Sequence, residues 1–404
     1  MPHKNKLELL SPAGDLSKLK YAYAYGADAV YLGLPDFSLR AKTGFDLKTL
    51  KEGIDYAHKL KKKVYVTVNI FAHNEHIHKL PNFLKQISKT NLDAIILSDP
   101  GVLLLVKKYL PRIPIHLSTQ ANTLNFEAVK FWQKNGVKRI ILGREATLSD
   151  IKEIHNKVPK VELEVFVHGA MCMSYSGRCY LSAWLNGRSA NEGSCTQPCR
   201  WNYKLYLEEP LRPGMMIPLE EDEKGIYILN SKDLCLVDYL GELKKAGVVS
   251  VKIEGRTKSH YYVAVATKAY RMALDNLNNK NKIKFAKEEL QKIDNRGYTT
   301  GFLLGKEGIK RQEFATSKQK SDWQFVGEVV ESRDRTIYFK PHNMLRISDR
   351  LELLTPKDCY RIKIKEFKDK DGKSWDEIHG GTKDIYSFEL PLKIDASWGL
   401  IRKK

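Results

Sequence analysis

Two cysteines, a histidine and two glycines fall within the thirteen residues 167–179, VHGAMCMSYSGRC. Thiols this close together serve as ligands of a soft metal, as nucleophiles, or as packed apolar groups. Six cysteines occur in the chain, and in a long chain of a reducing compartment their clustering indicates metal binding or catalysis rather than a disulfide framework. Five of them lie close in sequence: Cys172, Cys179, Cys195, Cys199 and Cys235.

The spacing of these thiols leaves several metal chemistries open. Thiolates without paired histidines favour zinc or an iron-sulfur cluster over hard cations. The chain lacks the short Cys-x2-Cys pairs that are usual in zinc ribbons. An iron-sulfur cluster needs four ligands but no single fixed spacing. A cluster, zinc and plain buried thiols therefore all remain, and Cys359, alone in the C-terminal region, is expected to be a buried or incidental thiol.

A nucleophilic cysteine is the rival interpretation. Cys172 follows His168 by four residues, but a catalytic pair must converge in space, and closeness in sequence does not establish that. The neighbouring thiols favour ligation instead. A serine mechanism is weaker, because MSYSG is not a nucleophile elbow.

The elements that must position these residues alternate between short β-branched runs and amphipathic, helix-like stretches. Such alternation predicts a parallel sheet, and eight units in roughly 260 residues favour a (β/α)8 TIM-like barrel over an open sheet. Gly26, Gly136 and Gly247 stand where a helix end favours a left-handed residue. The strand candidates are KLELLSPAGD, AYGADAVYLG, KKVYVTVNI, TNLDAIILSD, IPIHLSTQAN, QKNGVKRIILG, VELEVFVHGA and KKAGVVSVKIEG.

The pattern changes near residue 320, where short strands follow one another without helices. We therefore predict two domains: a barrel over 1–310 that carries a cysteine-bearing insertion, and a small C-terminal β-barrel over 320–404. The stretch NRGYTTGFLLGKEG is expected to connect them, and EEPLRPGMMIPLEEDEKG to form an exposed hairpin loop.

The period of two along the strands sorts aliphatic residues from polar ones. In LEVFVHG, Glu164, Phe166 and His168 share a face, and the same sorting places polar side chains of two other strands in the barrel lumen. Polar groups that gather at the C-terminal end of a barrel usually serve a site. The further lumen residues are His116, Ser118, Gln120, Lys252, Glu254 and Arg256.

The charge of the chain favours a polyanionic partner. Lys and Arg number 68 against 48 Asp and Glu, a net charge of +20 that is spread along the chain. The N-terminus, MPHKNKLELL, lacks the apolar region of a secretory signal, and the longest aliphatic run, GVLLLV, is too short for a membrane span. We expect a cytoplasmic protein with no membrane association.

Five segments resemble, in order and over nearly the whole chain, peptidase family U-32, the collagenase-like proteases. They are ELLSPAGDLSKLKYAYAYGADAVYLG, EVFVHGAMCMSYSGRCYLS, GSCTQPCRW, NSKDLC and VKIEGRTKS. Within that family, the length, the CRW segment and the C-terminal β domain are similar to the branch that hydroxylates tRNA. The resemblance implies conversion of a wobble uridine to 5-hydroxyuridine, with prephenate as oxygen source and a 4Fe-4S cluster as cofactor.

The resemblance also implies ligands. Cys172, Cys179 and Cys195 match the shared cysteine positions, and the fourth ligand is either Cys235, which we favour slightly, or Cys199. A peptidase and a noncatalytic RNA-binding accessory protein with a structural metal remain the alternative functions.

Other side chains are candidates for substrate binding and catalysis. Guanidinium groups bind carboxylates bidentately, so an arginine can clamp a small dicarboxylate such as prephenate. Acidic and imidazole groups in the lumen are candidates for proton transfer or ligand orientation. An Arg-Trp pair can hold phosphate and stack an unpaired base of tRNA. The candidates are Arg40, Arg144, Arg256 and Lys252 for the substrate, Glu164, His168 and again Arg256 for catalysis, and Arg200 and Trp201 for RNA.

Overall fold

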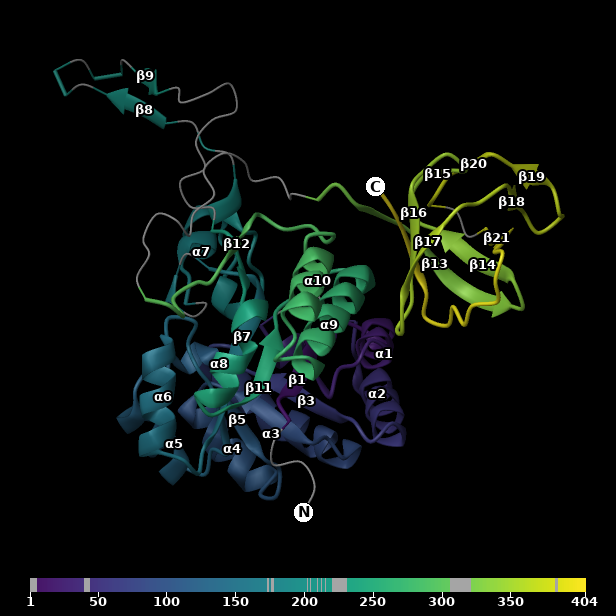
Figure 1. Ribbon diagram of the computed structural model, residues 1–404. Coiled ribbons are helices and arrows are strands. Elements are labelled where there is room, and N and C mark those ends of the chain that lie inside the picture. Colours follow the sequence, from purple (N-terminus) through teal and green to yellow (C-terminus); the bar gives the residue numbers. More distant parts are fainter. Residues whose placement is uncertain are drawn as a thin grey trace.

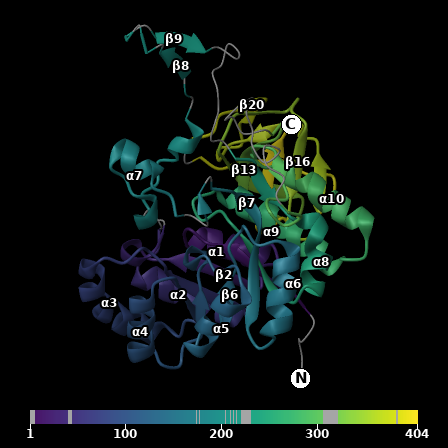
Figure 2. The same cartoon turned by 90° about the vertical axis from the view of Figure 1, so that its left-hand side faces the viewer.

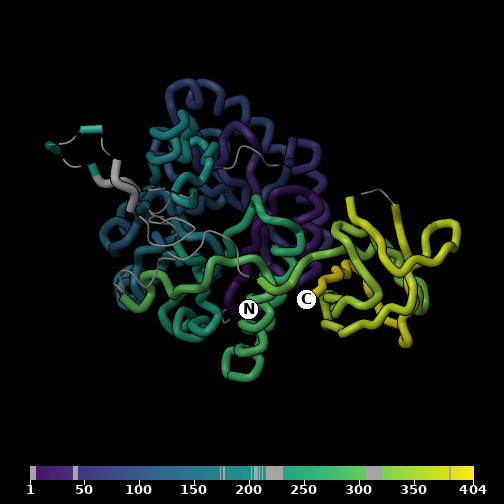
Figure 3. Tube along the Cα trace, turned by 90° about the horizontal axis from the view of Figure 1, so that it is seen from above, coloured from purple at the N-terminus to yellow at the C-terminus, as the bar shows by residue number. Residues whose placement is uncertain are grey.

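The computed structural model describes residues 6–39, 44–172, 174–175, 178–201, 203, 205–208, 210–211, 213–214, 216–219, 231–305, 321–381 and 384–404. They form a helix-wrapped barrel and a C-terminal sheet domain that lies beside it (Figure 1). Seen from above, the C-terminal domain stands to one side of the barrel (Figure 3). Within the described residues, no helix combines the length and the apolar character that crossing a membrane requires.

Eight parallel strands of the described chain close into a barrel. They are short runs rich in β-branched and aliphatic residues, as strands buried on both faces require. Strand β11 pairs with β1 on one side and β7 on the other, which closes the ring and confirms the predicted TIM-like fold. The strands are β1 (Glu8–Pro12), β2 (Ala29–Gly33), β3 (Lys63–Val68), β4 (Ala94–Leu97), β5 (Ile115–Leu117), β6 (Arg139–Ile141), β7 (Glu162–Ala170) and β11 (Val248–Ile253).

The helices of the barrel begin and end as the sequence signals indicate. Asp15, Asp46 and Asp99 each accept a hydrogen bond from a backbone N–H of the first turn that they cap. Gly26 and Gly136 follow helix ends with φ of 105° and 83°, as predicted. The α-helices are α1 (Leu16–Ala24), α2 (Leu47–Lys59), α3 (Asn74–Ile87), α4 (Pro100–Tyr109), α5 (Phe126–Lys134), α6 (Leu148–Lys157), α7 (Leu181–Asn186), α8 (Leu240–Lys245), α9 (His260–Asp275) and α10 (Lys280–Leu290).

Short 3-10 helices fill several of the connections. They are η1 (Pro35–Phe37), η2 (Ser88–Thr90), η3 (Thr119–Ala121), η5 (Ala190–Glu192), η6 (Pro198–Arg200) and η7 (Val237–Tyr239).

The cysteine-bearing insertion follows β7 and lies over the C-terminal mouth of the barrel. Its loop is held to neighbouring loops: Phe71 N–H donates to the Asn191 carbonyl at 3.2 Å, and Arg178 Nε donates to the Gln120 carbonyl at 3.0 Å. A hairpin of β8 (Leu205–Glu208) and β9 (Met216–Leu219) projects away from the barrel, and β9 occupies part of the segment that was predicted to be only a hairpin loop (Figure 1, Figure 2).

Two short strands extend the sheet beyond the barrel. Strand β10 (Asp233–Cys235) pairs antiparallel with the end of β7, and β12 (Tyr298–Thr299) pairs with β10. The segment expected to be only a connector between the domains therefore contributes a strand above the mouth.

The C-terminal domain is an eight-stranded antiparallel sheet in the order β17-β16-β22-β13-β14-β21-β18-β19, with a two-stranded ladder of β15 and β20. It has its own apolar core, centred on residues such as Phe339, Phe367 and Ile401. Its strands are β13 (Gln324–Arg333), β14 (Thr336–Pro341), β15 (Leu345–Arg346), β16 (Leu351–Leu354), β17 (Cys359–Ile362), β18 (Phe367–Lys368), β19 (Ser374–Trp375), β20 (Glu377–Ile378), β21 (Tyr386–Glu389) and β22 (Leu400–Lys403).

The two domains share a packed and hydrogen-bonded interface. Leu354 and Leu400 belong to the core of the barrel, and the Tyr25 hydroxyl contacts the Leu354 carbonyl at 3.0 Å. Arg402 is fully buried and donates to Glu352 of its own sheet and to Glu289 of α10. These contacts fix the C-terminal sheet against α1, α9 and α10.

Candidate functional site

The inner part of the barrel lumen contains a ring of paired charges. Arg139 lies between Glu8 and Glu164, with Nη1 to Glu164 Oε2 at 3.1 Å, and Lys252 Nζ lies 3.2 Å from Glu164 Oε1. Glu164 is wholly buried. Burial lowers the pKa of Lys252, and Glu164 opposes that shift. The structure therefore places Glu164, a candidate catalytic residue, and Lys252, a candidate for substrate binding, in a mutually neutralising network of ion pairs.

His116 belongs to the same inner layer. Burial lowers its pKa well below the ordinary value, and the nearby cation of Arg139 lowers it further. Its ring stands edge-on to Tyr65, whose hydroxyl donates to Glu8 at 2.8 Å. The neutral imidazole fits a network whose positive charges are already matched.

Arg256 lies at the mouth, three residues beyond the end of β11. Its Nη1 donates to the Ser38 hydroxyl at 2.5 Å and to the Thr67 hydroxyl at 2.9 Å, and its Nη2 donates to the Leu39 carbonyl at 2.6 Å. These contacts fix the orientation of the guanidinium at the mouth. A guanidinium in a fixed orientation is a group that can bind a carboxylate.

A second polar group follows the ends of β3 and β5. The Asn69 amide donates to the Ser118 hydroxyl and to Gln120 Oε1, both at 3.1 Å, and Ser118 also donates to Gln120. Ser118 and Gln120 were predicted to line the lumen, and here they face Asn69 across the mouth. These neutral donors and acceptors can orient the hydroxyl and carbonyl groups of a small substrate.

Arg144 follows the end of β6 by three residues, as Arg256 follows the end of β11. The end of β7 lies between them. Arg144 Nη1 donates to the Ala170 carbonyl at 2.7 Å, its Nη2 is 3.7 Å from Glu254 Oε2, and its guanidinium stacks on Phe166 at 4.1 Å. Its Nε is buried and has no hydrogen-bond partner among the described residues. A buried guanidinium donor left in this state is a specific reason to expect an anionic ligand here.

His168 is enclosed by aromatic rings rather than directed at a thiol. Its ring lies 5.8 Å from Tyr262, 5.4 Å from Tyr270 and 5.5 Å from Tyr298. Burial lowers the pKa of His168 to about 3, with Lys258 as a second cause. The imidazole is therefore neutral near pH 7, which suits a positioning or hydrogen-bonding role better than that of a protonated acid.

Four of the five clustered thiols lie near one another above the mouth. Burial raises the pKa of Cys199, and the neighbouring thiols of Cys172, Cys195 and Cys179 raise it further. The Gln197 backbone N–H donates to Cys195 Sγ at 3.3 Å. Backbone donors of this kind favour a thiolate, the form that binds metal.

Cys235 occupies a different environment. It is buried at the end of β10, opposite His168 in the β7–β10 ladder, and the Tyr270 hydroxyl lies 3.8 Å from its sulfur. Burial raises its pKa, and the charged side chains that act on it most are Asp238 and Lys287. Cys235 and Cys199 therefore both remain candidates for the fourth ligand.

The donor set fits an iron-sulfur cluster better than a single zinc ion. Four thiolates bound to zinc at about 2.3 Å stand about 3.8 Å apart. In the described chain, no three of the cysteine sulfurs come within 4.8 Å of one another, so the thiols are more widely spread than a compact zinc site requires. A 4Fe-4S cluster spreads its four cysteine ligands over four different irons.

Cations surround these thiols. Arg200 lowers the pKa of Cys199, against the dominant effect of burial, and Cys199 in turn acts on Arg296. Arg296 is held by Asp233, and both act electrostatically on Lys258. Positive side chains next to thiolates stabilise their negative charge. Arg200 thus lies close to Cys199, and Trp201 follows it directly in the chain.

Large aromatic side chains of the insertion face solvent. Trp201 is 44% exposed and Trp184 71% exposed, and Tyr175 and Tyr180 are also exposed. Exposed aromatic rings beside arginines are the elements on which unpaired bases stack.

Arg40, which the sequence predicted to bind a carboxylate, lies outside the described residues. Other residues of the site were missed by sequence reasoning. Tyr65, Thr67 and Asn69 alternate with valines along KKVYVTVNI and so share one face of the strand. The period of two could therefore have placed Thr67 and Asn69 in the lumen. Ser38 and Arg296 had no such signal, because only the folded chain brings them to the mouth.

Comparison with known proteins agrees with this geometry. The model of peptidase family U32 matches residues 14–313, and that of the peptidase family U32 C-terminal domain matches residues 321–402. The chain belongs to peptidase family U32.

Several curated U32 relatives are similar over much of this chain. The tRNA hydroxylation protein P of Escherichia coli is 40% identical and covers 96% of this chain and 94% of its own length. The protein of the same name from Helicobacter pylori is 46% identical over 81% of this chain and 79% of its own. The 23S rRNA 5-hydroxycytidine C2501 synthase of Escherichia coli is 38% identical over 67% of this chain and 40% of its own length.

Proposed function

We propose that this chain is an RNA-modifying enzyme that hydroxylates tRNA, converting a wobble uridine to 5-hydroxyuridine with prephenate as oxygen source and a 4Fe-4S cluster as cofactor. The observation that carries the proposal is a cysteine-bearing insertion, whose thiols of Cys172, Cys179 and Cys195 act electrostatically on Cys199, next to a barrel mouth that holds two arginines. The similarity to proteins named for tRNA hydroxylation, which extends over both domains, supports the substrate.

In the proposed arrangement, Cys172, Cys179, Cys195 and a fourth cysteine, either Cys235 or Cys199, hold the cluster, which when bound supplies a redox centre or Lewis acid at the mouth. Arg144 and Arg256 bind the carboxylates of the small co-substrate from either side of β7. The Asn69–Ser118–Gln120 group orients its remaining oxygens. Hydroxylation adds one oxygen atom to uridine and removes two electrons from it, and the oxygen donor accepts them.

The tRNA itself fits the surface around the mouth. The net charge of +20 supplies long-range attraction, and the exposed rings of Trp184 and Trp201 next to Arg200 offer a stacking surface for an unpaired base. We expect the tRNA affinity to fall on the order of a thousandfold between 50 and 200 mM salt if six or more phosphates are contacted. A flat salt response would assign the charge to an ordinary solvated surface.

The decisive test of this function is nucleoside analysis of tRNA from a strain that lacks the gene. The proposal predicts loss or reduction of 5-hydroxyuridine-derived wobble nucleosides, the same loss when prephenate synthesis is blocked, and rescue by the wild-type gene but not by Cys172→Ala. Unchanged nucleosides in a strain without a paralogue would contradict the proposal and favour a noncatalytic accessory role.

A peptidase is the other function that the family name raises. A Cys172–His168 pair is its natural candidate, but the His168 ring is enclosed by three tyrosines and its pKa is lowered to about 3. Peptide cleavage that disappears with Cys172→Ala would establish it in place of the hydroxylase.

A further inference from the structure

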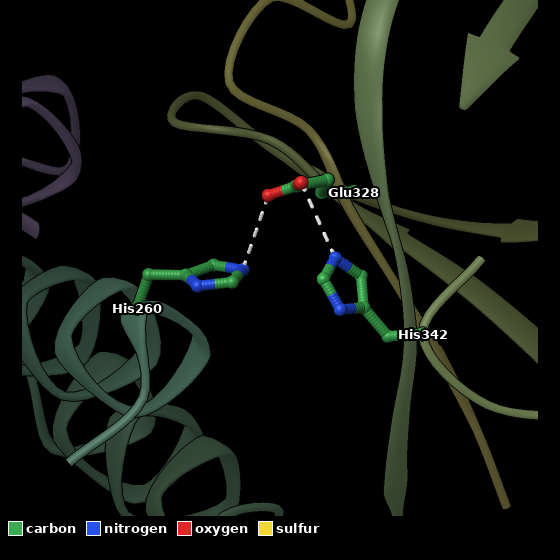
Figure 4. Close-up of side chains that lie close together, drawn as sticks. All are labelled: His260, Glu328 and His342. Carbon is green, nitrogen blue, oxygen red and sulfur yellow. Dashed lines mark ion pairs between the residues drawn. The ribbon is translucent and has the colours of Figure 1, made fainter. Parts of the chain in front are cut away.

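Three potential metal ligands meet where the C-terminal domain packs on the barrel, away from the cysteines. His260 is the first residue of α9, Glu328 lies on β13, and His342 directly follows β14. Figure 4 shows both imidazole rings directed at the Glu328 carboxylate. The ligand atoms of the three residues all lie within 4.8 Å of one another.

The separations match those of ligands around one ion. His260 Nε2 lies 3.4 Å from Glu328 Oε2, and His342 Nε2 lies 3.2 Å from Glu328 Oε1. Nitrogen and oxygen ligands at about 2.0–2.1 Å from a tetrahedral zinc ion stand about 3.3 Å from each other. The three side chains can therefore bind an ion with small rotations and without backbone movement.

Each ring nitrogen lies at ion-pair distance from the carboxylate but makes no hydrogen bond with it. Nε2 of His260 and Nε2 of His342 are both buried, and neither has a hydrogen-bond partner among the described residues. Two buried nitrogens that face one carboxylate without donating to it are also placed as ligands that share an ion would be.

The surrounding groups hold the rings in place and favour the neutral imidazole that metals require. His260 stacks on Tyr21 at 5.1 Å, and Phe325 contacts both rings, at 5.1 Å for His260 and 5.0 Å for His342. Burial lowers the pKa of His260, with Glu328 opposing. The neighbouring charges of Asp15 and Lys18 form their own ion pair at 3.0 Å.

A second cluster of potential metal ligands in the described chain differs from this one, because cations of the protein already fill it. Glu289, Glu352 and Cys359 also cluster, but the cations of Arg402 and Lys292 already occupy the space between their oxygens. No cation of the protein fills the corresponding position between His260, Glu328 and His342 in the described residues.

We propose that His260, Glu328 and His342 bind a zinc ion that joins the C-terminal domain to the barrel. Two imidazoles and one carboxylate are a donor set that zinc accepts, with water as the fourth ligand. The ligands come from a barrel helix and from two adjacent strands of the other domain, so the ion would stabilise the packing of one domain on the other. This inference does not rest on the proposed hydroxylation.

The test is zinc binding by the full-length chain, measured as ions per chain and by competition with a chromophoric chelator. The wild type should bind one zinc ion per chain more than Glu328→Gln and His342→Ala, because zinc held by the cysteines contributes equally to all three. Zinc should also raise the melting temperature of the wild type more than that of these variants. His379→Ala is the matched control, since His379 pairs with Glu377 at 3.2 Å on the exposed face of the same domain.

Spectroscopy with cobalt in place of zinc separates the two classes of site. The spectral component present in the wild type and absent from Glu328→Gln should lack thiolate-to-cobalt charge transfer. Glu328→Gln nearly preserves the side-chain shape, so it remains informative if His342→Ala fails to fold. Equal zinc content and equal thermal response in the wild type, Glu328→Gln and His379→Ala would overturn the proposal, as would binding of iron(II) with exclusion of zinc.

Discussion

The inner lumen and the mouth of this barrel are both rich in buried polar groups, yet their partners differ. In the inner lumen Arg139 and Lys252 meet Glu8 and Glu164, so the buried charges neutralise one another. At the mouth, the Ser38 and Thr67 hydroxyls and the Leu39 carbonyl position Arg256, and Arg144 keeps a buried Nε without a hydrogen-bond partner in the described chain. Ion pairs thus dominate the inner lumen, whereas hydrogen bonds to neutral oxygens position the arginines of the mouth.

This difference assigns separate roles to residues that look alike in the sequence. Glu164, Lys252 and Arg256 all come from polar faces of barrel strands, and sequence reasoning grouped them as candidates for one site. The structure suggests that Glu164 and Lys252 support the fold of the barrel, whereas Arg144 and Arg256 act on a ligand.

The largest effect that the comparison predicts is loss of stability when the inner network is broken. Glu164→Gln removes the carboxylate between two buried cations, which should cost about 3–5 kcal/mol of unfolding free energy. Glu162→Gln is the matched control, because the half-buried Glu162 pairs with the same Arg139 at 2.8 Å, and its loss should cost about 1 kcal/mol or less. Urea denaturation measures both. Equal costs would remove the distinction between the inner lumen and its rim.

A substitution at the mouth should affect ligand binding rather than folding. Arg144→Lys keeps the charge but loses the Nε donor and the planar fork, so KM for the small dicarboxylate should rise about 10- to 100-fold, the value of a charge-assisted hydrogen bond. Arg178→Lys is the control, since Arg178 Nε already donates to the Gln120 carbonyl. Unchanged KM together with a large loss of stability in Arg144→Lys would place Arg144 in the structural class.

The effect that is smallest at neutral pH concerns His168, whose neutral form the fold requires. Its pKa in the folded chain, about 3, lies below the ordinary value of 6.5. The unfolded chain therefore binds a proton first as pH falls, so this contribution to stability is complete above about pH 6.5 and is lost between about 6.5 and 3. The slope is about 1.4 kcal/mol per pH unit.

Replacement of His168 by Phe should remove that part of the pH dependence. The measurement is the unfolding free energy of both proteins at several pH values between 7 and 4, since carboxylates contribute to the total slope equally in each. Parallel profiles for wild type and His168→Phe would show that His168 does not resist protonation in the fold.

Much of this architecture could be predicted from the sequence, because it depends on local patterns. Eight β-branched runs separated by amphipathic helices predicted the barrel, and the period of two in LEVFVHG placed Glu164 and His168 on the inner face. The residues that escaped prediction depend on long-range contacts. Strands β10 and β12 are too short to have a pattern, and His260 meets Glu328 and His342 only after two domains pack.

The fourth ligand shows the same limit. Sequence matching slightly favoured Cys235 over Cys199. The folded chain places Cys235 at the end of β10, close to the Tyr270 hydroxyl, and Cys199 in the 3-10 helix η6 of the insertion. The spacing of the cysteines does not choose between the two, so the fourth ligand stays a prediction for the variants below.

The most direct test of the central claim is the iron content of the anaerobically purified chain. The account predicts about four irons per chain, loss of that iron in Cys172→Ala and Cys179→Ala, and loss in one of the two variants Cys235→Ala and Cys199→Ala. The variant of these two that loses the iron identifies the fourth ligand. Zinc as the native metal of the cysteines, or full iron retention in Cys172→Ala and Cys179→Ala, would contradict the claim that these thiols hold an iron-sulfur cluster at the mouth of the barrel.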